Sequence, residues 1–188
     1  MDISPYQGVG GRGPEGGIGP TCKDCGWSTW VELAGGPSDD VYHPNIDKRP
    51  LANVDIVHNL EEGIPFHNGH AQKLKMVDVI NYLTQEGARV FLRECFRVLA
   101  PGGSLWLRTV DLPWVCEMVT RDKVPYQGWL EALFHSPDTA DGPLGEGFHR
   151  WGYSFESLKA ELEAAGFVRV EHKGWYNRWE FKCEAFKP

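Results

Sequence analysis

The stretch FLRECFRVLAPGGSLWLRTV, residues 91–110, decides the fold class, because it combines a helix, a sharp stop and a strand. Thr84 is a suitable N-cap, and the apolar spacing after it predicts a helix over residues 85–99 with one buried face. Pro cannot continue a helix and Gly adopts positive φ readily, so residues 100–103, Ala-Pro-Gly-Gly, end it. The apolar run at 104–110 then predicts a buried strand.

Strand and helix patterns alternate on both sides of this stretch. A second helix is predicted at 155–165, after the N-cap Ser154, and Gly166 suits the left-handed position that ends it. This alternation is typical of an α/β fold with a mainly parallel, Rossmann-like sheet, here closed by a C-terminal antiparallel hairpin. The other predicted strands are 29–34, 55–58, 73–77, 167–173 and 178–187.

Composition bounds the class of protein. The chain has 188 residues, 41% of them hydrophobic and 24% charged, which suits a single soluble domain. Five cysteines, an odd number, argue against a disulfide framework and for a reducing, cytoplasmic location. A net charge of -7 disfavours nucleic acid as a partner, and without a run of 18 apolar residues we expect no membrane span.

The chain divides into an arm and a domain. Residues 1–28 are expected to form a flexible Gly-rich arm with a C-x-x-C motif, and 29–188 a single domain. Within that domain, 113–147 is expected to be a lid or acceptor-recognition insert. The short connections after the first two strands leave no room for crossover helices. We therefore expect the N-terminal arm or a second subunit of a homodimer to cover one face of the sheet.

Candidate ligand-binding residues follow the predicted strands, because ligands of such sheets bind beyond the carboxyl ends of the strands. The small residues after the first strand let backbone amides approach a ligand, although a Gly-Gly-Pro turn is more often only a turn. An acidic residue after the second strand is suited to the ribose hydroxyls of a nucleoside cofactor. These candidates are Ala34, Gly35, Gly36, Asp47, Asn59, Asp78 and Asp111.

Several blocks of sequence, in order and at compatible spacing, resemble one known family. They are ELAGGP (32–37), PNID (44–47), VDIVHNL (54–60), RVLAPGG (97–103) and HRWGY (149–153). From Trp30 to Phe167 the chain is similar to compact class I S-adenosylmethionine-dependent methyltransferases of the methyltransferase-11-like type. The resemblance implies a seven-stranded sheet that holds S-adenosylmethionine over its carboxyl edge.

The resemblance also assigns roles to residues of this chain. It implies that Ala34, Gly35 and Gly36 lie against the methionine part of the cofactor, and that Asp47 holds the ribose. Asn59 and Leu60 would border the adenine, and Met76 belongs to the same predicted cofactor set. The chain departs from the family pattern at five positions, with Ala34 for glycine, Asn59 and Gln72 for aspartate, and Asn81-Tyr82 for Glu-His.

Methyl transfer is an in-line displacement that depends mainly on positioning, so a dedicated base is optional. His149 is the first candidate for a base, and Asp78 and Asp111 are the second. Arg150 suits an anionic acceptor, beside Trp151 and Tyr153 as aromatic walls. The leading hypothesis is methyl transfer to a small-molecule or glycan acceptor. The alternative, motivated by the departures, is a binding or regulatory protein of the same fold without catalysis.

The motif Cys22-Lys23-Asp24-Cys25-Gly26 provides half of a tetrahedral zinc site. The other three cysteines are isolated in the sequence, so histidines or a partner chain would have to complete the site. We therefore expect no bound metal, and keep a zinc-dependent interaction module as a third hypothesis.

Overall fold

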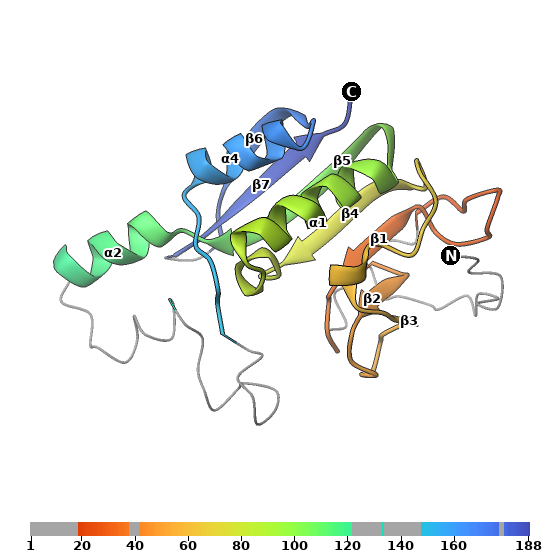
Figure 1. Ribbon diagram of the computed structural model, residues 1–188, viewed down its shortest axis with the longest axis horizontal. Helices are drawn as coiled ribbons and strands as arrows, with labels where there is room; N and C mark the ends of the chain where they lie inside the picture. Colours follow the sequence, from red (N-terminus) through yellow and green to blue (C-terminus); the bar gives the residue numbers. More distant parts are fainter. Residues whose placement is uncertain (1–18, 38–41, 122–132, 134–147, 177–178) are drawn as a thin grey trace.

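The computed structural model describes residues 19–37, 42–121, 133, 148–176 and 179–188, and Figure 1 shows their arrangement around one sheet. The seven strands follow the order β3-β2-β1-β4-β5-β7-β6. All neighbours are parallel except β7, which runs antiparallel to both β5 and β6. This confirms the predicted α/β fold with its C-terminal antiparallel pair. The strands are β1 (Trp30–Leu33), β2 (Asn45–Asp47), β3 (Ile56–Val57), β4 (Ala71–Val77), β5 (Leu99–Val110), β6 (Val168–Trp175) and β7 (Glu180–Phe186).

The helices begin at the predicted caps. Helix α1 (Gln85–Val98) is capped by Thr84, whose hydroxyl accepts the Gly87 N–H at 3.1 Å. Helix α4 (Phe155–Ala164) begins with a capping box formed by Ser154 and Ser157. Helix α2 (Leu112–Arg121) lies where the sequence indicated only an insert. The 3₁₀ helices are η1 (Leu60–Glu62) and η2 (Ile80–Tyr82).

Strand β5 starts earlier than its apolar run predicted. It takes over at Leu99, directly after α1, and so includes the Ala-Pro-Gly-Gly segment. Gly102 has φ +77°, and its N–H donates to the Lys187 carbonyl, while Lys187 N–H donates to the Gly103 carbonyl. The segment therefore both ends the helix and pairs with the chain's last residues.

The two faces of the sheet differ in chemistry. Helices α1 and α4 lie across the same face (Figure 1), where β1, β4, β5 and β7 contribute fully buried apolar side chains such as Leu33, Leu107 and Phe181. The opposite face carries charged and aromatic side chains. Lys75 pairs there with Glu32 at 3.2 Å, and the Lys73 ammonium lies 4.2 Å from the Trp30 ring. Such pairs allow water to cover this face. Of the predicted covering arm, residues 1–28, the part at 1–18 lies outside the described residues, and the part at 19–28 forms a turn closed by a bridge between Thr21 and Ser28.

The described residues between β1 and β2, and between β2 and β3, form no helix, as the short connections predicted. Among the helices in the described ranges, none combines the length and apolar character needed to cross a membrane. The predicted insert is described only at its start, in α2, and at residue 133.

Candidate functional site

A cavity of about 590 Å³ lies at the carboxyl edge of the sheet. Its wall is built from the segments that follow three neighbouring strands, residues 34–36 after β1, 47–49 at the end of β2 and 77–79 after β4. Residues 59–61 and Arg150 complete much of the remaining wall. Both the position and the volume suit a small organic ligand, for which protein pockets span roughly 300–1,000 Å³.

Asn45 fixes the small-residue turn after β1. Its side chain is fully buried, and its Oδ1 accepts the Gly35 N–H at 3.1 Å while its Nδ2 donates to the Gly36 carbonyl at 2.9 Å. Gly36 has φ +60°, a conformation that favours glycine. Asn45 is therefore a positioning residue, which the sequence showed only as part of the PNID block.

Ala34 and Asp78 share a left-handed backbone at the ends of the adjacent strands β1 and β4, with φ of +54° and +55°. This conformation costs a non-glycine residue roughly 1–2 kcal/mol. Ala34 stands where the family carries glycine, so the chain keeps the glycine conformation despite the methyl group. Backbone strain of this kind gathers at ligand sites, and both residues line the cavity.

Asp47 is a buried carboxylate at the end of β2, with 2% of its surface exposed. Oδ2 accepts the Gly36 N–H at 3.2 Å, and Oδ1 accepts the Arg49 backbone N–H at 2.9 Å. The Arg49 guanidinium donates to both oxygens, at 3.2 and 3.4 Å. Because a carboxylate accepts about four hydrogen bonds, a ligand hydroxyl would have to displace the Arg49 side chain, which is 36% exposed.

Asp78 offers an unused acceptor. Its Oδ2 lies 2.5 Å from Nη2 of Arg108, which holds the carboxylate in place. Its Oδ1 is buried and has no hydrogen-bond partner among the residues that the structure describes. A ligand ammonium group at this wall would satisfy that oxygen.

Six of the seven predicted cofactor residues line the cavity: Ala34, Gly35, Gly36, Asp47, Asn59 and Leu60. Met76 does not. It is fully buried and points to the helix-covered face beside Leu33 and Leu107, because alternate strand residues face opposite ways. Its neighbours Val77 and Asp78 line the cavity instead.

Of the predicted catalytic residues, only Asp78 lines the cavity. Asp111 instead begins helix α2, where its Oδ1 accepts the Trp114 N–H at 3.0 Å, and burial raises the pKa of its carboxyl group. His149 lies with its ring edge-on to Tyr82 at 5.0 Å and its Nδ1 3.1 Å from the Leu133 carbonyl.

Of the predicted acceptor residues, only Arg150 lines the cavity. Tyr153 is 1% exposed and belongs to the core, where burial raises the pKa of its phenol to about 12. Trp151 is 40% exposed and lies outside the cavity wall.

Asn81 and Tyr82, which replace the family's Glu-His, have separate positions. Asn81 is buried, its backbone carbonyl accepts the N–H groups of Arg150 and Trp151, and its side-chain oxygen accepts the Thr109 hydroxyl. Asn81 thus holds the loop that carries Arg150 against the cavity. Tyr82 lines the cavity itself. Lys48 and Arg49 also line it, and the sequence analysis did not identify them, since nothing but their position after the PNID block pointed to the cavity.

Comparison with known proteins shows likeness of structure alone. No protein-family model matches the sequence, and no curated protein matches it. A SAM-dependent methyltransferase of Thermotoga maritima, described as a possible histamine N-methyltransferase, is 15% identical, with a TM-score of 0.57 over 85% of this chain and 82% of that one.

Two further methyltransferase structures give the same result. A SAM-dependent methyltransferase from Archaeoglobus fulgidus has a TM-score of 0.61 at 10% identity and covers 84% of this chain and 85% of its own. One from Aquifex aeolicus has a TM-score of 0.53 at 18% identity, over 85% of this chain and 81% of its own. The chain therefore has the Rossmann-like fold of class I S-adenosylmethionine-dependent methyltransferases.

Proposed function

We propose that the cavity binds S-adenosylmethionine and that the chain transfers its methyl group to a small-molecule or glycan acceptor. The observation that carries this proposal is Asp47, a buried carboxylate at the end of β2 that is hydrogen-bonded to the Gly36 N–H across the edge of the cavity. A carboxylate in this position suits the two hydroxyls of a ribose.

The rest of the wall fits the other parts of the cofactor. The backbone of the turn at 34–36 lines the cavity, where the methionine part could contact it. The Oδ1 of Asp78, which has no hydrogen-bond partner among the described residues, would accept the ammonium group of the cofactor. Asn59 and Leu60 would border the adenine, since an amide both donates and accepts. When bound, S-adenosylmethionine supplies an electrophilic methyl group on a positively charged sulfur.

The chain's own contribution is to orient the acceptor and exclude water. Arg150 lines the same cavity, which favours an acceptor that carries a carboxylate or a phosphate. The Asp78 carboxylate is paired with Arg108, so we assign it a binding role before a role as a base.

Calorimetric titration with S-adenosylmethionine and S-adenosylhomocysteine tests this proposal. We expect micromolar binding to the unaltered chain. Asp47→Ala should weaken it at least about tenfold, because hydrogen bonds to a charged group contribute roughly 1.5–3 kcal/mol. Glu117→Ala, an exposed carboxylate on α2, is the matched control and should bind as the unaltered chain does.

Absence of heat with either ligand, from a chain shown to be folded by circular dichroism, would overturn the proposed function. Binding followed by no methyl transfer to any carboxylated or phosphorylated acceptor would instead favour the non-catalytic alternative, a binding or regulatory protein.

The contact between Arg49 and Asp47 gives a second prediction. Arg49→Met should tighten S-adenosylhomocysteine binding about threefold to fivefold, because a partly exposed ion pair worth about 1 kcal/mol no longer has to open. Lys48→Met removes the same charge from the same wall and should leave the affinity nearly unchanged. Weaker binding by Arg49→Met would show that Arg49 contacts the ligand directly.

A further inference from the structure

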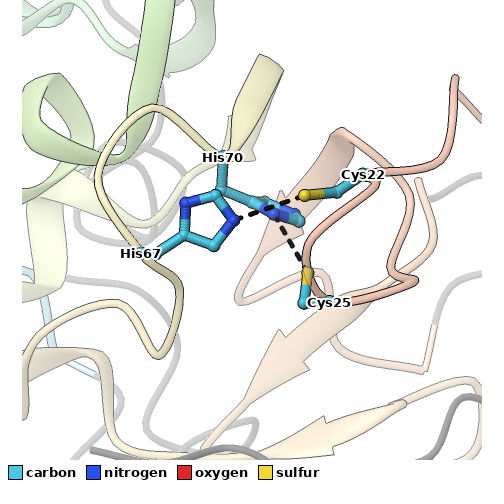
Figure 2. Close-up of side chains that lie close together, drawn as sticks. All are labelled: Cys22, Cys25, His67 and His70. Carbon is cyan, nitrogen blue, oxygen red and sulfur yellow. Dashed lines mark hydrogen bonds between the residues drawn. The ribbon is translucent and has the colours of Figure 1, made fainter.

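Two cysteines and two histidines meet at the amino edge of the sheet, opposite the cavity. Figure 2 shows Cys22 and Cys25 facing His67 and His70. Cys22 Sγ lies 3.3 Å from His67 Nε2, and Cys25 Sγ lies 3.5 Å from His70 Nδ1. One sulfur or nitrogen from each of the four residues lies within 4.8 Å of all the others.

These distances suit a tetrahedral metal site. With metal–sulfur bonds of about 2.3 Å and metal–nitrogen bonds of about 2.05 Å, tetrahedral geometry separates sulfur from nitrogen by about 3.6 Å. The two sulfur–nitrogen contacts, at 3.3 and 3.5 Å, lie close to this separation. Two thiols and two imidazoles around one point are the donors that zinc selects.

The cysteines sit on a tight turn that directs both thiols to the same side. An antiparallel bridge between Thr21 and Ser28 closes the segment, and the Cys22 N–H donates to the Trp27 carbonyl at 2.7 Å. The Gly26 N–H donates to the Cys22 carbonyl at 3.0 Å, with Gly26 at φ +78°. Glycine directly after the second cysteine thus lets the backbone fold back beneath the thiols.

Each histidine presents an unprotonated nitrogen to the cysteines. The second ring nitrogen of His67, Nδ1, lies 2.9 Å from the Asn68 carbonyl, and that of His70, Nε2, lies 3.0 Å from the Ser28 carbonyl. A carbonyl only accepts, so these nitrogens carry the protons of the neutral rings. The nitrogens that face the thiols therefore keep their lone pairs, which is how metal-binding histidines are oriented.

Packing holds the histidine segment in place before any metal binds. His70 is 2% exposed, and its ring stacks on Phe66 at 4.0 Å with an interplanar angle of 6°. Arg97 of α1 donates to the Ile64 and Phe66 carbonyls and to the Asn68 side chain, at 2.8–2.9 Å. Such preorganisation favours tight and selective binding.

From these contacts we propose that Cys22, Cys25, His67 and His70 bind one zinc ion in a closed, structural site. Binding displaces the two thiol protons, and the two thiolates balance the charge of Zn²⁺. All four positions come from protein, so none is left for a substrate or a reactive water. The ion would fasten the segment before β1 to the segment before β4, two adjacent strands, at the edge away from the cavity.

From the sequence we expected no bound metal, because only one pair of ligands, Cys22 and Cys25, was identified there. That pair, His67-Asn68-Gly69-His70, has the same two-residue spacing as the cysteines but lies 45 positions later. The structure supplies both histidines from the same chain, so neither a partner chain nor a dimer is needed to complete the site.

Metal analysis of the full chain, purified without chelator, tests the proposal. We expect one zinc per chain, and a cobalt-substituted form with the visible absorption bands of tetrahedral cobalt bonded to thiolates. Cys22→Ser should lose the metal, and His67→Gln, at an exposed position that the fold tolerates, should weaken metal binding at least tenfold. Cys116→Ser, an exposed thiol on α2, should keep one zinc per chain.

Several results would overturn this proposal. They are a folded chain that holds no metal and gives no tetrahedral cobalt spectrum, stoichiometric iron in place of zinc, and metal retained in full by both ligand variants. A Cys22–Cys25 disulfide found by mass spectrometry in freshly purified protein would overturn it as well. None of these measurements depends on S-adenosylmethionine binding.

Discussion

Removal of the metal from the Cys22, Cys25, His67 and His70 site is expected to lower the midpoint of thermal unfolding by about 10 °C. The four ligands converge only in the folded chain, so the metal stabilises the folded state alone. This stabilisation is about 4 kcal/mol when free metal exceeds the dissociation constant a thousandfold. For a domain of this length, each kcal/mol shifts the midpoint by about 2–4 °C.

Calorimetric scans of the chain before and after dialysis against a chelator measure this shift, and added zinc should restore the midpoint. Cys116→Ser should show the same shift, because its thiol lies on α2. Cys22→Ser should already unfold at the lower temperature and should not respond to the chelator. Equal midpoints with and without metal in the unaltered chain would contradict the expectation.

A metal at this place would stabilise the part of the sheet that has the least helical cover. The described residues that connect β1, β2 and β3 contain no helix, so these strands bury less apolar surface than β4 and β5, which α1 covers. The ion would fasten the start of β1 to its neighbour β4, at the point where helical cover is thin.

Local signals made most of the fold predictable. The helix at 85–98 and the turn after it follow from one cap, one apolar face and one Ala-Pro-Gly-Gly stop, all contiguous in the chain. The cavity residues after β1 were predictable for the same reason, since they directly follow a short apolar run, whereas Asp47 was placed by the resemblance of the PNID block and β2 itself was not among the predicted strands. Helix α2 was missed although Asp111 caps it and Pro113 stands in its first turn, because Asp111 was interpreted as a candidate base and 113–147 as an insert.

Features that depend on exact register or on distant partners were not predictable. Met76 was assigned to the cofactor site, and alternation along β4 places it in the core, one residue away from the wall. His67 and His70 share the two-residue spacing of the cysteines, but only the fold brings them to the thiols. The ion pair between Arg49 and Asp47 was likewise not predictable, because it depends on the conformation of the Arg49 side chain in the loop after β2.

Replacement of Arg97 by methionine is the other change with a large expected effect, about 3 kcal/mol of lost folding stability. Its guanidinium makes five hydrogen bonds at 2.8–2.9 Å, two to Glu94, two to the Ile64 and Phe66 carbonyls and one to Asn68. Loss of a donor that leaves buried acceptors unsatisfied costs roughly 1–3 kcal/mol, and here several acceptors lose the same donor. This arginine belongs to the RVLAPGG block, so that block's role here is structural.

The pH dependence of folding stability distinguishes the charged contacts between Arg97 and Glu94 from simple packing. The Arg97 side chain, helped by the Ile64 N–H, lowers the pKa of Glu94 below its ordinary 4.5 against the opposing effect of burial. A carboxyl group whose folded pKa is lowered adds stability above its unfolded pKa, and this stability is lost as the pH falls through the folded value. The difference between the unaltered chain and Arg97→Met should therefore be full at pH 7 and smaller well below pH 4.5, when Glu94 is protonated.

Urea unfolding at neutral pH and in the acid range measures both differences. Arg121→Met, which removes an exposed arginine paired with Glu117 one turn away on α2, is the matched control and should change stability by less than about 0.5 kcal/mol at either pH. Arg97→Met should also bind cobalt more weakly, because Arg97 holds the carbonyl of Phe66 and the side chain of Asn68 on either side of His67. An Arg97→Met chain with unchanged stability would show that the loop before β4 is held by the metal site alone.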